Sequence, residues 1–116
     1  MSGYIYLASP YSHPEEAVRL ERFHAACKKA AQYASKGMAH FCPIAQSHPV
    51  SDHMEAAKRM DFALWMKNDL PLLRMAQELH VLCIEGWRTS RGVTREIEYA
   101  TQLGIPVKQV FLDIEP

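Results

Sequence analysis

The hydrophobic positions of this chain form two kinds of pattern that alternate along its length. Compact apolar runs predict β-strands over residues 4–8, 38–42, 79–84 and 107–112. Between them, apolar residues recur every three or four positions, which predicts helices over residues 14–36, 54–75 and 93–103. Strands that alternate with helices favour a parallel sheet with right-handed crossovers. We therefore expect an α/β fold, a three-layer flavodoxin-like or Rossmann-like sandwich.

The predicted sheet has four or five strands in the order 2-1-3-4, and residues 1–116 form one domain, since this length is typical of a single domain. Two features interrupt the regular pattern. Residues 46–53 are rich in Ser, His and Pro and are predicted to be a long polar loop. Asn68, Asp69 and Pro71 are expected to break the helix over residues 54–75, because a proline disturbs a helix interior.

Composition narrows the class of partner. The chain has 13 basic and 13 acidic residues and no basic stripe, which argues against polymeric nucleic acid and favours a small-molecule ligand. Three isolated cysteines argue against a disulfide framework. The apolar run near the N-terminus is too short for a signal peptide or a membrane helix, so we expect a cytoplasmic protein without a membrane partner.

Ligands of open parallel sheets bind outside the carboxyl ends of the strands. Four segments are expected at that edge: residues 9–14, residues 46–53, the region of Asp69, and residues 85–92. They hold many of the polar and aromatic residues of the chain. Their position alone predicts a binding site there.

Glu96 is the most informative residue of the last predicted helix. At about 100° per residue, it falls between Ala100 and Leu103, on the same side as Val93 and Ile97. A carboxylate on an inward-facing stripe costs several kcal/mol unless it is paired or hydrogen-bonded. Glu96 is therefore either a functional carboxylate or the partner of a nearby arginine in an ion pair that braces the helix.

The segment Ser90-Arg91-Gly92 opens the same helix, and helix starts offer free backbone N–H groups to anions. Asp69 is the second candidate carboxylate, since cleavage of a sugar bond commonly uses two carboxyl groups in different protonation states. On its own, Asp69 is more typical of a helix N-cap. Tyr6, in the first strand, is more typical of a core residue than of a catalytic one.

Other chemistries find little support. The histidines His48 and His53 match no zinc-binding pattern, and no metal or cofactor is expected. The chain contains no GxGxxG, no Walker loop and no GxSxG elbow, which disfavours dinucleotide redox chemistry, P-loop chemistry and serine hydrolysis.

Three segments resemble the nucleoside 2-deoxyribosyltransferase-like superfamily, and more closely a compact bacterial and phage branch related to 2′-deoxynucleoside 5′-monophosphate N-glycosidases. The matching segments occur in the order of the family, at residues 5–10 (IYLASP), 68–70 (NDL) and 90–97 (SRGVTREI). The chain departs from the family at Glu98, in the segment 85–89 before Ser90, and in the replacement of a glycine-rich loop by residues 9–13.

The resemblance implies a role for each matched residue. Glu96 would be the nucleophile that attacks the anomeric carbon, Asp69 would assist protonation of the leaving base, and Tyr6, or else Tyr11, would orient the nucleophile. Ser90 and Gly92 would contact the 5′ end of the substrate or its phosphate.

Further substrate contacts are expected around these residues. Ser9 lies at the end of the first strand; Arg91, Arg88 or His13 would supply a positive charge for a phosphate. Trp87, Tyr11 or His48 would stack on the base or bond to it.

The sequence thus predicts an enzyme that cleaves the N-glycosidic bond of a nucleoside or nucleoside 5′-monophosphate, by hydrolysis or base transfer. The alternative is a nucleotide-binding or sensing module without turnover. Because the chain is short, we expect a homodimer or homotetramer whose subunits complete each other's sites.

Overall fold

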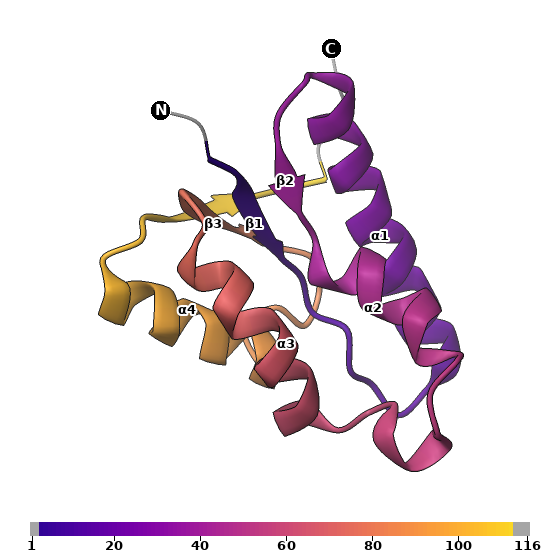
Figure 1. Ribbon diagram of the computed structural model, residues 1–116. Helices are drawn as coiled ribbons and strands as arrows, with labels where there is room; N and C mark the ends of the chain where they lie inside the picture. The colour runs from indigo at the N-terminus through magenta and orange to yellow at the C-terminus, as the bar shows by residue number, and fades with distance from the viewer. Residues whose placement is uncertain (1–2, 113–116) are drawn as a thin grey trace.

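The computed structural model of the protein describes residues 3–112. Strands and helices alternate along these residues, as Figure 1 shows. The strands are β1 (Ile5–Ala8), β2 (His40–Phe41), β3 (Glu78–Leu82) and β4 (Val107–Val110). The helices are α1 (Glu16–Ser35), α2 (Pro43–Ser51), α3 (Phe62–Arg74) and α4 (Arg91–Leu103), with a short 3-10 helix, η1 (Ala56–Lys58), before α3.

The four strands form one parallel sheet in the order β2-β1-β3-β4, which confirms the predicted fold class and strand order. The chain passes from β1 to β2 on one side and then crosses to β3 on the other side of β1. This reversal places the switch point of the sheet between β1 and β3. Crevices at switch points, outside the carboxyl ends of the strands, are where such folds bind ligands.

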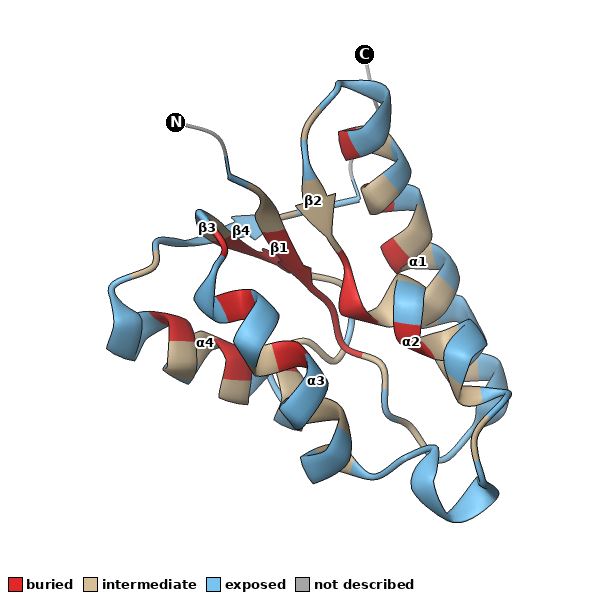
Figure 2. Ribbon diagram, viewed as in Figure 1, coloured by how far each residue is buried: buried red, intermediate tan, exposed pale blue. Residues whose placement is uncertain are grey.

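Alternation along β1 divides the core between the two faces of the sheet. Tyr6 and Ala8 pack with residues of α3 and α4 in one buried cluster, whereas Leu7 packs with residues of α1 in the other. In Figure 2 the buried residues follow the sheet and the inner faces of the helices, with α3 and α4 on one side and α1 and α2 on the other. The molecule is therefore the predicted three-layer sandwich.

The prediction of a polar loop over residues 46–53 is wrong for residues 46–51, because α2 extends to Ser51. Pro43 occupies the first turn of α2, where its fixed φ angle favours a helix and its missing N–H costs nothing. Ile44 and Ala45 pack against the core cluster on the α1 side. The burial of this face stabilises a helix, although the segment is rich in polar residues.

The predicted break at residues 68–71 is also wrong, since α3 is continuous through these positions. Pro71 leaves the carbonyl of Lys67 without its helical partner, but both residues are exposed, so water can satisfy that carbonyl. The helix begins later than predicted. Asp61 is its N-cap, and its side chain accepts a hydrogen bond from the backbone N–H of Leu64 at 3.1 Å.

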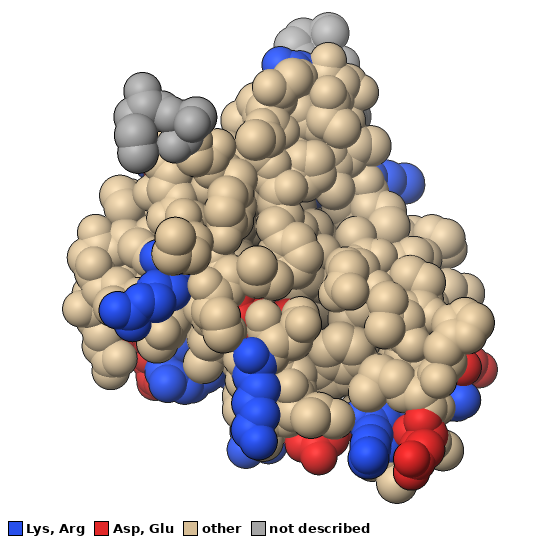
Figure 3. Space-filling model, in the orientation of Figure 1, with Lys and Arg blue, Asp and Glu red and all other residues tan. Residues whose placement is uncertain are grey.

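Charged residues are scattered over the surface. On the face shown in Figure 3, lysine and arginine side chains stand apart from one another near the lower edge, and acidic atoms also appear in a recess near the centre. Within residues 3–112, none of the helices has the length and apolar character required to cross a membrane.

Candidate active site

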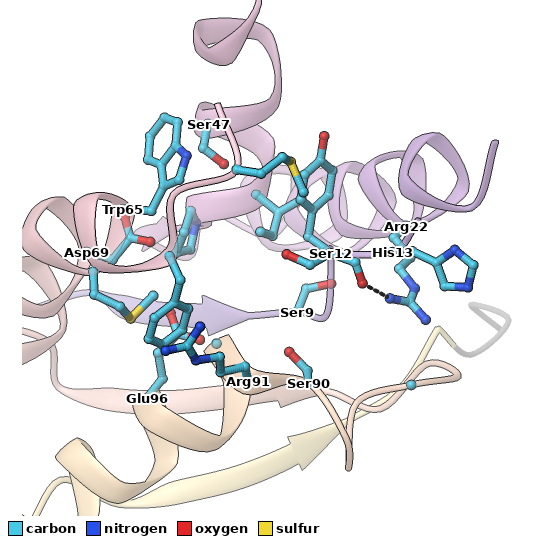
Figure 4. A pocket seen from close by; sticks show the side chains of 18 of the residues that line it. Ser9, Ser12, His13, Arg22, Ser47, Trp65, Asp69, Ser90, Arg91 and Glu96 are labelled. Atoms are coloured by element: carbon cyan, nitrogen blue, oxygen red, sulfur yellow. Dashed lines mark hydrogen bonds between the residues drawn. The ribbon is translucent and has the colours of Figure 1, made fainter. Parts of the chain in front are cut away.

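A cavity of about 550 Å³ opens at the carboxyl ends of β1 and β3. Its wall comes from the loop after β1, from α1, α2 and α3, from the loop after β3, and from the first turns of α4. Figure 4 shows side chains from these segments converging on it. The cavity therefore lies beside the switch point of the sheet, as expected for this fold.

Glu96 lies in the wall of this cavity and is only 4% exposed. The Tyr6 side chain is fully buried in β1, and its hydroxyl donates a hydrogen bond to Glu96 Oε2. No arginine among the described residues forms an ion pair with Glu96, so the alternative of an ion pair that braces the helix finds no support in them. A buried carboxyl group that borders a cavity is instead available to a ligand.

Asp69 faces the same cavity from α3 and is 5% exposed. The side-chain amide of Asn68 donates a hydrogen bond to Asp69 Oδ1 at 3.0 Å. Because Asp61 caps α3, Asp69 lies well inside the helix and is not its N-cap. The cavity thus collects two buried carboxyl groups from two different helices.

Burial controls the protonation of these groups. Burial raises the pKa of Glu96, the hydrogen bond from Tyr6 opposes this shift, and the nearby Asp69 adds to it; together these effects bring the pKa from 4.5 to about 8. Burial also raises the pKa of Asp69, and the hydrogen bond from Asn68 opposes this shift. The pKa of Tyr6 is raised by burial and by Glu96, so its hydroxyl remains a donor. Near neutral pH, the pair can hold one proton between its two carboxyl groups.

The start of α4 borders the other side of the cavity. Ser90 is the N-cap, and its Oγ accepts a hydrogen bond from the backbone N–H of Val93 at 3.2 Å. Arg91 and Gly92 follow in the first turn, where backbone N–H groups have no partner within the helix. A Cβ atom at Gly92 would meet no heavy atom closer than 4.0 Å, so packing alone does not require glycine there.

Polar groups gather at the end of the cavity formed by the loop after β1. Ser9 is 5% exposed, and its Oγ has no hydrogen-bond partner within the described residues. Arg22, from α1, donates a hydrogen bond from Nη1 to the carbonyl oxygen of Ser12 at 2.9 Å. Its guanidinium group also covers Gly86, whose φ of +93° and close approach to Arg22 both favour glycine.

Most of the side chains predicted from the sequence lie together. Those that line the cavity are Ser9, Tyr11, His13, Asp69, Ser90, Arg91, Gly92 and Glu96. Tyr6 stands directly behind Glu96 and contacts it through the hydrogen bond. The tertiary structure thus brings residues from β1, α3 and α4 to one place.

Two predicted substrate contacts do not line the cavity. The His48 ring shares a hydrogen bond with the Tyr11 hydroxyl at 2.6 Å through Nδ1 and stacks on Phe23 at 4.1 Å between ring centroids. Trp87 packs against the core cluster between the sheet and the helices α3 and α4, and the Arg88 guanidinium lies 5.1 Å above its ring. Both side chains are half-buried against other side chains of the protein and lie outside the cavity wall.

Several lining residues were missed, above all on α3. Phe62, Trp65 and Met66 line the cavity together with Asp69. These four positions have the spacing i, i+3, i+4 and i+7, which puts them on one helix face. That spacing could have been recognised once the helix was taken as continuous. Arg22 had no such signal, since nothing in its neighbours along the chain indicates a cavity.

Two aromatic contacts shape this wall. The Arg91 guanidinium lies 3.9 Å above the Phe62 ring, and the Trp65 indole N–H donates to the carbonyl oxygen of Arg59 at 2.8 Å. Within residues 3–112, no three His, Cys, Asp or Glu side chains are arranged to hold a metal ion. The wall itself presents carboxyl, hydroxyl, guanidinium, imidazole, thioether and aromatic groups.

Comparisons with known proteins agree with this fold. Residues 3–111 match a family described as "Domain of unknown function (DUF1937)". No curated protein matches the chain. Among solved structures, the 2-deoxyribosyltransferase of the psychrotolerant bacterium Bacillus psychrosaccharolyticus is similar over 97% of this chain and 77% of that chain, with a TM-score of 0.66 and 22% sequence identity. The similarity confirms the nucleoside 2-deoxyribosyltransferase-like fold predicted from the sequence.

Proposed function

Because the chain belongs to the DUF1937 family and has a nucleoside 2-deoxyribosyltransferase-like fold, we propose that it cleaves the N-glycosidic bond of a nucleoside 5′-monophosphate or nucleoside. One observation carries this proposal: two buried carboxyl groups, Glu96 and Asp69, border one cavity and are each held by a neutral hydrogen-bond donor. Cleavage of a glycosidic bond uses such a pair, one ionised and one protonated.

The pair supplies both steps of the reaction. In the reactive form of the pair, the one proton that the two carboxyl groups share is on Asp69 and Glu96 is ionised. Glu96 then attacks the anomeric carbon while the bond from carbon to the base nitrogen breaks, and the electron pair of that bond stays on the base. Asp69 gives its proton to the base nitrogen as it leaves. Water then attacks the anomeric carbon of the glycosyl ester, the bond from that carbon to Glu96 breaks with its electron pair staying on the carboxylate, and ionised Asp69 accepts one proton from the water. A second base in place of water gives transfer instead of hydrolysis.

Tyr6 has a supporting part in this mechanism. Its hydroxyl donates to Glu96 Oε2, which stabilises the ionised form of Glu96 and leaves Oε1 to attack. As the ester forms, the negative charge on Glu96 disappears. The hydrogen bond from Tyr6 therefore holds the nucleophile in place through a step that changes its charge.

The distribution of groups along the cavity favours a nucleotide. Trp65, Asp69 and Glu96 lie at one end in Figure 4, and His13 and Arg22 lie at the other, with Ser9 and Ser90 between them. The aromatic and carboxyl end suits a base and its sugar carbon. The end with Arg22 suits an anion.

Three donors support a phosphate at the second end. Ser9 Oγ is buried without a partner, which costs about 1–3 kcal/mol unless a ligand pairs with it. Arg22 has no carboxylate partner among the described residues, and its only hydrogen bond goes to a carbonyl oxygen. The first turn of α4 adds backbone N–H groups and the positive end of a helix dipole. A 5′-phosphate would satisfy all three.

The function is tested by incubating the protein with a panel of ribo- and deoxyribonucleosides and their 5′-monophosphates. Free base is then measured by chromatography. Release of base from one class of substrate supports the proposal. Tight binding of a nucleotide, measured by calorimetry, without any release of base would instead establish a sensing module.

Arg22→Gln tests the phosphate end. We expect kcat/KM for a 5′-monophosphate to fall about 10- to 100-fold, which corresponds to the loss of a charged hydrogen bond. The value for the matching nucleoside should change less than about twofold. Steady-state assays of base release on the two substrates measure both values.

Arg19→Gln is the matched control. Arg19 lies one turn earlier on α1 and donates to the carbonyl oxygen of His13 at 2.5 Å, but it does not line the cavity. The Arg19→Gln variant should leave kcat/KM unchanged for both the 5′-monophosphate and the nucleoside. An equal loss on nucleoside and monophosphate in Arg22→Gln would show that Arg22 only supports the loop.

A further inference from the structure

The two carboxyl groups of the site are held in the same way. Each accepts a hydrogen bond on one oxygen from a neutral donor: Oε2 of Glu96 from Tyr6, and Oδ1 of Asp69 from the amide of Asn68 at 3.0 Å. Asn68 lies outside the cavity wall, on the exposed side of α3. It therefore has no direct contact with a ligand in the cavity, and whatever it contributes must pass through Asp69.

An amide N–H group can only donate, so the oxygen that it faces must present a lone pair. In a protonated carboxyl group, the carbonyl oxygen is a stronger acceptor than the hydroxyl oxygen. The hydrogen bond from Asn68 to Oδ1 therefore favours the form of Asp69 that carries its proton on Oδ2. The hydrogen bond thus decides which of the two oxygens of Asp69 is the acid.

We propose that Asn68 is a positioning residue, which places the transferable proton of Asp69 on Oδ2 and fixes the plane of that carboxyl group toward the leaving base. This inference rests on the proposed function. It adds a residue to the machinery and assigns the reacting oxygens, Oε1 of Glu96 for attack and Oδ2 of Asp69 for proton transfer. A general acid transfers its proton well only when the donor atom lies within hydrogen-bond reach of the acceptor.

The electrostatic surroundings are consistent with this role. Asp69 is faced by Glu96 from α4 and by Tyr6 from β1, and both interact with its charge. Burial raises the pKa of Asp69, whereas Asn68 lowers it. Removal of the amide should therefore raise this pKa further and shift the loss of acid activity to higher pH.

The test uses Asn68→Ala and two substrates that share one sugar. The first is the nucleotide that the wild-type protein cleaves, whose base needs a proton to leave. The second carries 4-nitrophenolate in place of the base, which departs without a proton. We expect kcat for the nucleotide to fall about 10- to 100-fold, less than the roughly 10²- to 10⁴-fold that general acid catalysis contributes, because Asp69 itself remains. The nitrophenyl substrate should change less than about twofold, since Glu96 is untouched.

The pH profile gives a second readout. The high-pH limb of kcat for the nucleotide should move to higher pH in Asn68→Ala, because this limb reports loss of the one proton that the pair holds, which is on Asp69 in the reactive form. Lys67→Ala is the matched control, as Lys67 is exposed next to Asn68 and is not among the groups that shift the pKa of Asp69. It should leave both rates and the profile unchanged.

Two results would overturn the inference. The first is an equal loss of kcat on both substrates in Asn68→Ala, which would mean a general disturbance of α3. The second is an unchanged kcat for the nucleotide together with an unshifted pH profile. Failure of the proposed function is a separate outcome, because in that case the wild-type protein itself would release neither base nor nitrophenolate.

Discussion

Glu96→Gln is expected to lower the rate of base release by about 10³-fold or more, because the amide oxygen is a poor nucleophile and cannot form the glycosyl ester. The substitution preserves size, and the amide oxygen can still accept the hydrogen bond from Tyr6. Binding of the nucleotide should therefore persist. Single-turnover assays of base release, together with calorimetry of nucleotide binding, measure the two effects separately.

Glu98→Gln provides the control on the same helix. Glu98 is exposed, two residues along α4 from the buried Glu96, so the loss of its charge should leave base release unchanged. If Glu96→Gln kept its activity, Glu96 could not be the nucleophile, although the fold would be unaffected.

The same substitution should also change how stability depends on pH. The pKa of Glu96 is about 8 in the folded protein and about 4.5 when exposed, so the folded state holds a proton that the unfolded state releases. Stability of the wild-type protein therefore falls as the pH rises from about 4.5 to about 8 and levels off above that range. The contribution is at most about 5 kcal/mol, set by the separation of the two pKa values.

Glu96→Gln removes this titration. Below pH 4.5 the two proteins should unfold with similar free energies, and above pH 8 the variant should be the more stable one. Urea denaturation from pH 4 to pH 9, followed by circular dichroism, measures the difference. Asp69 contributes a dependence of the same sign to both proteins, because burial raises its pKa in each. Parallel curves for the two proteins would show that Glu96 is ionised in the folded state without cost.

Much of the fold could be predicted from the sequence because it rests on local periodicity. Apolar runs identified all four strands, and the alternation with helices predicted their parallel order. The same reasoning placed Glu96 on the buried side of α4, and Ser90 at its start, since helix periodicity and capping depend on neighbours along the chain. Asp69 was chosen for its chemistry, although the local reading of it as an N-cap was wrong.

The tertiary structure alone decided the rest. Contacts with α1 and the sheet made α2 a helix, and they turned His48 toward Phe23 instead of the cavity. Only the packing of α1 beside the loop after β3 brings Arg22 to the mouth of the site. The raised pKa of Glu96 likewise depends on burial and on the distance to Asp69. Periodicity predicts the direction in which a side chain points from its own helix or strand. The groups that it contacts there belong to residues far away in the chain, so only the tertiary structure shows them.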